Sequence, residues 1–264
     1  MKLVIQHNLL NELSLLDIKA VVDKHSLPCV YVGVIPFSGE ITSDEPLVGK
    51  EYLPYGSTAL TVETHKLGWR GQYFDPITFN AEAWLENRDD MLNGDHVVSL
   101  NEAIELLRTY SPTTDMFLRP SEDLKQFSGQ VMAAGEAANW LEDARNCASS
   151  GSYQLSPNTA IVISEPKNIR AEWRWFIVGG KIISGSMYRN RGQLMKAREN
   201  YQSVISEAQR FADKWLPHPC CVMDLAVVDN EVKVIEFNTI NSSGFYDHDV
   251  EKVFVELYKY ACKE

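Results

Sequence analysis

The sequence predicts an α+β protein in which an N-terminal α/β domain is followed by a part built on antiparallel sheets. Strand-like and helix-like segments alternate over the first third of the chain. Two long strand pairs follow in the second half, each joined by a short turn, and a helical pattern closes the chain. The length of 264 residues suits two modest domains.

Apolar spacing and capping residues define the elements of the first part. Ser99 precedes a helical pattern and Glu102 follows it by three residues, which is a capping box. The segment 53–57 contains Pro54 and Gly56 and is expected to be a loop. The expected strands and helices are Lys2–Gln6, Leu13–Lys24, Cys29–Ile35, Asn80–Glu86 and Ser99–Tyr110.

A domain boundary is expected near residue 112, because a helix must end before Pro112. The sequence therefore divides into residues 1–112, an α/β domain, and residues 113–264, an antiparallel-rich α+β domain. Outside the two strand pairs, the expected elements of the second part are Asp115–Leu118, Gly135–Ala148, Thr159–Ser164 and Val250–Cys262.

Composition excludes several classes of protein. The formal net charge of −11 disfavours binding to nucleic acid, since an acidic surface repels a phosphate backbone. The 5 cysteines are odd in number and form no Cys-x-x-Cys motif, so we expect reduced thiols. No apolar run is long enough to span a bilayer and no signal peptide begins the sequence. We expect a cytoplasmic protein without a membrane partner.

The last strand pair contains three oxygen-bearing side chains. Asp224 lies in its first strand, and Glu236 and Asn238 lie in its second. A two-residue turn at Asp229-Asn230 would place Asp224 and Glu236 on opposite faces, whereas a three-residue turn that includes Glu231 would pair them. We expect the three-residue turn.

Two carboxylates and an amide on one open face suit Mg²⁺, which prefers oxygen ligands and usually shares them with substrate phosphates. An ordinary amphipathic hairpin with solvent-facing polar residues has the same pattern. The polar loop Asn238–Gly244 directly after the strand favours a site, because loops at strand ends commonly contact substrates.

The middle strand pair places arginines around a carboxylate. Gly179-Gly180 predicts a two-residue turn, and that register puts Glu172 and Arg174 on the same face as Arg189. Converging guanidinium groups can clamp a phosphate or carboxylate through paired hydrogen bonds. A ladder of solvated surface ion pairs is the alternative interpretation.

Other site types fit the sequence poorly. It contains no Gly-x-x-x-x-Gly-Lys-Ser/Thr, no Gly-x-Gly-x-x-Gly and no Gly-x-Ser-x-Gly. Upstream, Arg119 ends a strand and Lys125 follows in a polar loop, so both could cover nucleotide phosphates. The strand that ends at Ser164-Glu165 is equally compatible with a buried structural strand.

In this order the motifs resemble those of the ATP-grasp superfamily, in which two α+β subdomains with antiparallel sheets hold ATP between them. The similarity is closest to the ribosomal-protein glutamate ligase type, through Glu172-x-Arg174, Arg189, Asp224 and Glu236-x-Asn238. The segments around Arg119-Pro120 resemble a clade of short bacterial and phage ATP-grasp proteins. The family usually has Lys-Pro where this chain has Arg119-Pro120. This difference lies in the segment that would cover the triphosphate of ATP.

The resemblance implies a function and a role for each residue. It implies an ATP-dependent, ADP-forming carboxylate–amine ligase that acts through an acyl phosphate, with ATP and Mg²⁺ as cofactors. Alternatives are a kinase that phosphorylates a small molecule or protein, and a non-catalytic nucleotide-binding module. The implied roles are metal binding for Asp224, Glu236 and Asn238; phosphate contact for Arg119 and Lys125; adenine and ribose contact for Ser164, Glu165 and Lys167; catalysis for Arg174 and Arg189; and contact with the incoming substrate for Asn241 and Ser242.

Overall fold

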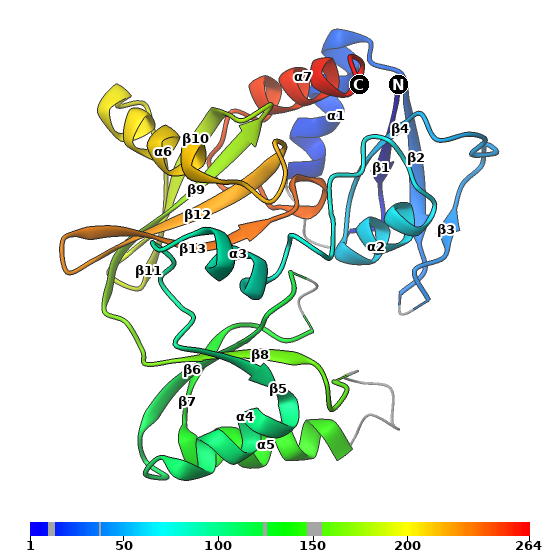
Figure 1. Ribbon diagram of the computed structural model, residues 1–264. Helices are drawn as coiled ribbons and strands as arrows, with labels where there is room; N and C mark the ends of the chain where they lie inside the picture. The colour runs from blue at the N-terminus through cyan, green and yellow to red at the C-terminus, as the bar shows by residue number, and fades with distance from the viewer. Residues whose placement is uncertain (10–13, 37, 124–125, 147–154) are drawn as a thin grey trace.

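The computed structural model contains three sheets, each with its own helices (Figure 1). It describes the chain except for residues 10–13, 37, 124–125 and 147–154. Within the described ranges helices and antiparallel strands are mixed, which confirms the predicted α+β class. We call the sheet of the first strands, with its helices, the N-terminal layer. The five-stranded sheet is the large central sheet, and the remaining four-stranded sheet with its helices is the small layer.

The N-terminal layer has strand order β3-β2-β1-β4, with β1 parallel to both β2 and β4. Its hydrophobic core includes residues of α1 and of the last helix, α7, so the two ends of the chain pack together. The elements are β1 (Lys2–Gln6), α1 (Ser14–His25), β2 (Cys29–Val34), β3 (Ile41–Thr42), β4 (Tyr52–Tyr55), α2 (Thr58–Lys66) and α7 (Val250–Ala261).

The small layer is an antiparallel sheet of order β5-β8-β6-β7, with two helices packed on one face (Figure 1). Its elements are β5 (His96–Ser99), α4 (Leu100–Thr109), β6 (Asp115–Pro120), β7 (Gln130–Ala133), α5 (Ala134–Asn146) and β8 (Ala160–Ser164). Because β5 pairs with β8, the boundary expected near residue 112 falls inside this layer, between α4 and β6. The layer begins near His96.

The large central sheet has order β11-β10-β9-β12-β13, and all its neighbours are antiparallel. One face packs on α6 and α3 around Trp175, Met223 and Phe237. The elements are α3 (Ala81–Asn87), β9 (Ile169–Val178), β10 (Lys181–Asn190), β11 (Gln193–Arg198), α6 (Gln202–Lys214), β12 (Cys221–Val228), β13 (Glu231–Asn238) and the short 3₁₀ helix η2 (Ile240–Ser242).

The β12–β13 connection differs from the predicted turn. Val228 pairs with Glu231, so the turn has two residues, Asp229 and Asn230, and both have positive φ. The three-residue turn is therefore wrong. Asp224 nevertheless pairs with Glu236, as predicted, because a β-bulge inserts Ile235 into β13 and restores the facing that the shorter turn would have lost.

Two further bulges shape the β9–β10 pair. Gly179 and Gly180 have φ values of 59° and 76°, which confirms the two-residue turn. Register shifts occur between Ile182 and Ser184 and between Met187 and Arg189. Two shifts of one residue each preserve the facing, and Arg189 pairs directly with Glu172.

No helix among the described residues combines the length and the apolar character needed to cross a lipid bilayer.

Candidate active site

The polar face of both strand pairs lines a cavity of about 410 Å³ between the large central sheet and the small layer. The sheet supplies the floor, and residues of β6 together with Glu122, Asp123 and 127–129 supply the opposite wall. Its charged lining residues include Arg119, Glu172, Arg174, Arg189, Asp224 and Glu236. We refer to this space as the central cavity.

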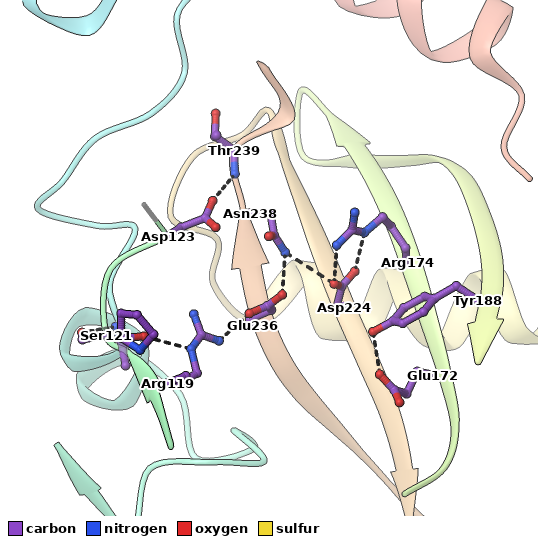
Figure 2. A network of polar contacts seen from close by, with 12 residues as sticks. Arg119, Ser121, Asp123, Glu172, Arg174, Tyr188, Asp224, Glu236, Asn238 and Thr239 are labelled. Atoms are coloured by element: carbon purple, nitrogen blue, oxygen red, sulfur yellow. Dashed lines mark hydrogen bonds and ion pairs between the residues drawn. The ribbon is translucent and has the colours of Figure 1, made fainter. Parts of the chain in front are cut away.

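The three predicted metal ligands converge at one point of its floor (Figure 2). The Asn238 side-chain nitrogen lies 3.4 Å from Asp224 Oδ2 and 3.2 Å from Glu236 Oε1, and donates to both. Asp224 comes from β12, and Glu236 and Asn238 come from β13. Strand alternation alone would have turned Glu236 into the core, so the bulge at Ile235 makes this convergence possible.

Asp224 is held by Arg174 from the neighbouring strand. The guanidinium donates from Nε and Nη2 to the two carboxylate oxygens, at 2.9 and 2.7 Å. Both side chains are buried. Burial raises the pKa of the Asp224 carboxyl while Arg174 opposes that change, and the Asp224 charge keeps the pKa of Arg174 above its ordinary value. Arg174 therefore compensates the buried negative charge of Asp224, which would be strongly destabilising without a partner.

Glu172 is the second carboxylate of the floor. It accepts hydrogen bonds from the Tyr188 hydroxyl at 2.8 Å and from Arg189 Nη1 at 3.2 Å. The bulge in β10 lets the adjacent residues Tyr188 and Arg189 reach the same carboxylate, although neighbours in a regular strand face opposite ways. Half of the Arg189 side chain remains exposed, so its guanidinium can also meet a ligand.

Two tyrosines that sequence reasoning missed complete this side of the cavity. Tyr246 stacks on Tyr188 with ring centroids 4.8 Å apart and planes 9° apart. The Arg174 guanidinium carbon lies 5.1 Å from the Tyr246 ring centroid and 5.9 Å from that of Tyr188. Burial raises the pKa of Tyr188, so its hydroxyl stays protonated and serves as a donor to Glu172. Tyr246 lies in a loop and Tyr188 is placed by the bulge in β10, so the sequence gives no signal for either placement.

The small layer contributes Arg119, whose Nη1 forms an ion pair with Glu236 Oε2. The guanidinium also lies over the Trp84 ring, with its carbon 5.2 Å from the centroid. Nearby, Asp123 accepts a hydrogen bond from the Thr239 backbone nitrogen at 2.9 Å. The wall from β6 is thus tied by charge to the end of β13, and Arg119 faces the predicted ligands (Figure 2).

Residues 58–257 match the family described as "ATP-grasp domain, R2K clade family 3". This match covers most of the chain and includes every residue of the central cavity. The chain belongs to this ATP-grasp family. The predicted resemblance to ATP-grasp proteins is confirmed.

Solved structures share the fold of this ATP-grasp chain. A D-alanine–D-alanine ligase from Bacillus anthracis matches with a TM-score of 0.63 and 11% identity, over 100% of this chain and 98% of that chain. A RimK domain ATP-grasp protein from Sphaerobacter thermophilus matches with a TM-score of 0.57 and 12% identity, over 90% of each chain. The ATP-grasp ligase PsnB, in a complex with a phosphomimetic variant of its minimal precursor, Mg and ADP, matches with a TM-score of 0.52 and 12% identity, over 98% and 97%. No curated protein sequence matches this chain.

The residues expected to contact adenine and ribose lie where β8 of this ATP-grasp chain leads into β9. Ser164 is buried and accepts from the backbone nitrogens of Gly94 and Asp95 through its hydroxyl, at 2.9 and 3.3 Å. Glu165 and Lys167 also contact Asp95, through the Glu165 backbone nitrogen and the Lys167 ammonium. Ser164 thus has a structural task, while the Glu165 side chain is exposed. Lys125 lies outside the described residues.

Asn241 does not line the central cavity. Its amide nitrogen donates to the carbonyls of Pro54 and Gly71, at 2.7 and 2.9 Å, and its oxygen accepts from the Tyr73 backbone nitrogen at 2.9 Å. With its donors and acceptor used in this way and the side chain buried, Asn241 joins η2 to the N-terminal layer. This geometry argues against the substrate contact expected from the sequence. Ser242, the next residue, is half-buried.

The donor set of the central cavity fits Mg²⁺. No group of three or more His, Cys, Asp or Glu side chains suited to a metal occurs in the part of the chain that the structure describes. The candidate set instead combines the carboxylates of Asp224 and Glu236 with the amide of Asn238. All three offer oxygen, the ligand atom that hard divalent cations prefer, and none offers sulfur or imidazole nitrogen.

Proposed function

We propose that this ATP-grasp protein is an ATP- and Mg²⁺-dependent, ADP-forming ligase that joins a carboxylate to an amine through an acyl phosphate. The convergence of Asp224, Glu236 and Asn238 in a cavity between two antiparallel sheets carries the proposal. Membership of the ATP-grasp family supports it. Two of the proteins that share its fold, the D-alanine–D-alanine ligase and PsnB, are named as ligases, which also supports it.

The chemistry requires charge control more than a protein nucleophile. A carboxylate is a poor electrophile, so its oxygen first attacks the γ-phosphorus of ATP and ADP leaves, which forms an acyl phosphate. The amine then attacks the acyl carbon, phosphate leaves, and the amine loses a proton as the amide forms. Positioning and electrostatic stabilisation supply most of the acceleration in such reactions.

Asp224, Glu236 and Asn238 would hold Mg²⁺, which when bound offsets the negative charge of the phosphate oxygens. Arg189, with its half-exposed guanidinium, would orient the transferring phosphoryl group. Arg119 would move from Glu236 to the phosphates, a role that Lys125 would share. The family resemblance implies a catalytic role for Arg174. We infer instead that Arg174 acts through Asp224 as a positioning residue, because it fixes both oxygens of that carboxylate.

The nucleotide base would lie toward the segment after β8. Glu165 and Lys167 flank the passage from the small layer to the large sheet, where a base held between the two sheets can meet both. Ile235 lines the central cavity because of the bulge, and its apolar side chain would contact the nucleotide.

The direct test is product analysis of the purified protein with ATP and Mg²⁺ over a panel of carboxylic acids and amines. A ligase releases ADP and phosphate only when both substrates are present, and mass spectrometry finds an amide. A stable phosphorylated product without any amine would instead establish a kinase. Stabilisation of the fold by ATP and Mg²⁺ without turnover of any pair would support a non-catalytic nucleotide-binding module.

The metal assignment makes a prediction at Glu236. Glu236→Gln removes one negative ligand but keeps the shape of the side chain, so ATP turnover should fall at least about 100-fold while the melting temperature changes little. Glu231→Gln is the matched control, because Glu231 lies on the same strand and is exposed. Turnover assays across a Mg²⁺ titration measure the effect. Equal activity of the two variants would reject Glu236 as a metal ligand.

A further inference from the structure

A second concavity, of about 830 Å³, lies at the outer end of the large central sheet. Its residues Ala171 and Trp173 alternate along β9 with Glu172 and Arg174, so it opens on the face opposite the central cavity. We call it the outer groove. The proposed ligase chemistry does not use it.

The floor and one wall of the outer groove are apolar. Ala171, Trp173 and Val227 come from β9 and β12. Leu194 and Met195, from β11, form the wall and are 68% and 47% exposed. Two large adjacent apolar side chains left open beside a concave surface are typical of a place where another chain docks.

Trp173 has an unsatisfied hydrogen-bond donor. Its indole nitrogen is buried and has no hydrogen-bond partner. A buried donor without an acceptor costs about 1–3 kcal/mol. A ligand that supplies an acceptor to this nitrogen would therefore bind more tightly. A peptide carbonyl or a carboxylate provides that acceptor, whereas a purely apolar ligand does not.

The end of the groove is cationic. Arg170 and Arg191 both line it, and among the described residues neither forms an ion pair. Arg170 donates instead to the amide oxygen of Asn230 at 2.7 Å. These charges stand on a chain whose formal net charge is −11, so they form a local exception to an acidic surface. An acidic ligand therefore matches the groove better than a basic one.

The strand beside the groove is an edge strand. β11 is the first strand in the order of the large central sheet and pairs with β10 alone. The Arg198 nitrogen at its end already donates to Asp247 Oδ2 at 3.0 Å, so an extended peptide can add as a further strand along the part of the edge before Arg198. A basic turn at Arg191-Gly192, with positive φ at both residues, joins this edge to β10.

We propose that the outer groove and the free edge of β11 bind an extended acidic peptide segment of a partner protein, with apolar side chains against Leu194 and Met195 and carboxylates toward Arg170 and Arg191. A hollow of about 630 Å³ shares these two arginines with the groove and shares Glu172 and Arg189 with the central cavity. The cationic end of the groove therefore continues around the Arg191-Gly192 turn toward the central cavity, while the rest of the groove stays on the opposite face of the sheet. Binding does not depend on the ligase reaction, so it can be tested without turnover.

Fluorescence anisotropy with the full-length protein tests the proposal. The probe is a fluorescein-labelled octapeptide of alternating glutamate and leucine, and the comparison peptides replace glutamate by lysine or leucine by serine. We expect saturable binding of the first peptide, weakened by salt, and binding at least about tenfold weaker for both comparison peptides. The same anisotropy measurement with Mg²⁺ and ATP present should give the same affinity.

Two variants locate the site. Arg191→Glu and Leu194→Ser should each weaken binding by about tenfold and leave the melting temperature unchanged, because both residues are exposed. Arg108→Glu, on the exposed face of α4, is the control of equal charge change and should bind as the unaltered protein does. Absence of saturable binding, equal binding of the lysine peptide, or equal affinity of the Arg191→Glu and Arg108→Glu proteins would each overturn the proposal.

Discussion

At the residue scale, each carboxylate on the floor of the central cavity has one arginine. Glu172 pairs with Arg189, Asp224 with Arg174 and Glu236 with Arg119. The pairs differ in burial: the Arg174–Asp224 pair is almost completely buried, whereas half of the Arg189 side chain is exposed. Substitution in the buried Arg174–Asp224 pair should therefore lower the free energy of unfolding more than substitution of Arg189, because water screens an exposed ion pair more than a buried one.

The buried pair leads to a prediction about stability. Arg174→Met leaves the Asp224 charge uncompensated and should lower the free energy of unfolding by about 3–5 kcal/mol. Asp224→Leu leaves the Arg174 charge uncompensated and should lower it by a similar amount. The double variant removes both charges and should lose far less than the sum. Urea unfolding followed by circular dichroism measures all three. Strict additivity would show that the two side chains do not depend on each other.

His248 provides a prediction about pH. Burial, with Arg174 and Arg198 nearby, lowers its pKa to about 3, below its ordinary value of 6.5. Its Nδ1 lies 3.0 Å from the Ser184 hydroxyl, and the neutral ring is the form that the fold accepts. The unfolded chain then binds the proton more readily, so this contribution to stability is complete above pH 6.5 and is lost as the pH falls toward 3.

The measurement is unfolding by denaturant between pH 7 and pH 4.5. Below pH 6.5, His248 should contribute a decrease of about 1 kcal/mol in the free energy of unfolding for each unit by which the pH falls. His248→Gln should remove this contribution to the slope. Comparison of the two proteins cancels the titration of the other groups. Parallel pH profiles would mean that His248 is protonated as easily in the fold as outside it.

At the element scale, local rules located most helices and strands. The strand Lys2–Gln6 has its predicted bounds, and Ser99 and Glu102 form the predicted capping box. Segment 53–57 was expected to be a loop because of Pro54, but β4 is an edge strand, where proline is tolerated. The short strand β5 depends on pairing with β8, more than 60 residues later, and no local pattern shows that partner.

The bulges explain why part of the site could be predicted and part could not. The sequence paired Asp224 with Glu236 through a three-residue turn that the structure does not have, and the observed two-residue turn would have separated them without the bulge at Ile235. A bulge is stabilised by the tertiary contacts of the strands around it, so the sequence of the hairpin alone does not reveal it. Tyr188 reaches Glu172 by the same device, and Tyr246 reaches the cavity from a loop.

The β9–β10 pair allows a prediction at Gly185, which pairs with Trp175. A Cβ atom at Gly185 would lie 2.1 Å from the Trp175 ring, and that ring is completely buried. Gly185→Ala should therefore destabilise the fold by about 1–3 kcal/mol, the usual range for overpacking a core. Gly244→Ala is the control, because a Cβ there meets nothing within 4 Å. Equal melting temperatures of the two variants would show that Trp175 can shift freely.

At the scale of the whole molecule, the large central sheet joins the other two layers by different means. Its contact with the N-terminal layer is a continuous apolar core that includes Phe176, Phe245 and Phe254. Its contact with the small layer is apolar at Val162 but polar at the central cavity, through Arg119 and Glu236 and through Asp123 and Thr239. The site thus lies at the junction where the two sheets are connected by charges that a charged ligand can compete for.

Asn241 tests how far the junction with the N-terminal layer is separate from the site. Asn241→Ala leaves the carbonyls of Pro54 and Gly71 and the Tyr73 nitrogen without their partner, so the free energy of unfolding should fall by about 3 kcal/mol. The KM for each substrate, measured well below the melting temperature, should stay the same. Ser242→Ala, at the neighbouring half-buried position, should change stability by less than about 1 kcal/mol. A raised KM with unchanged stability would return Asn241 to the substrate contact that the sequence predicted, because a side chain that binds only the ligand contributes nothing to the fold without it.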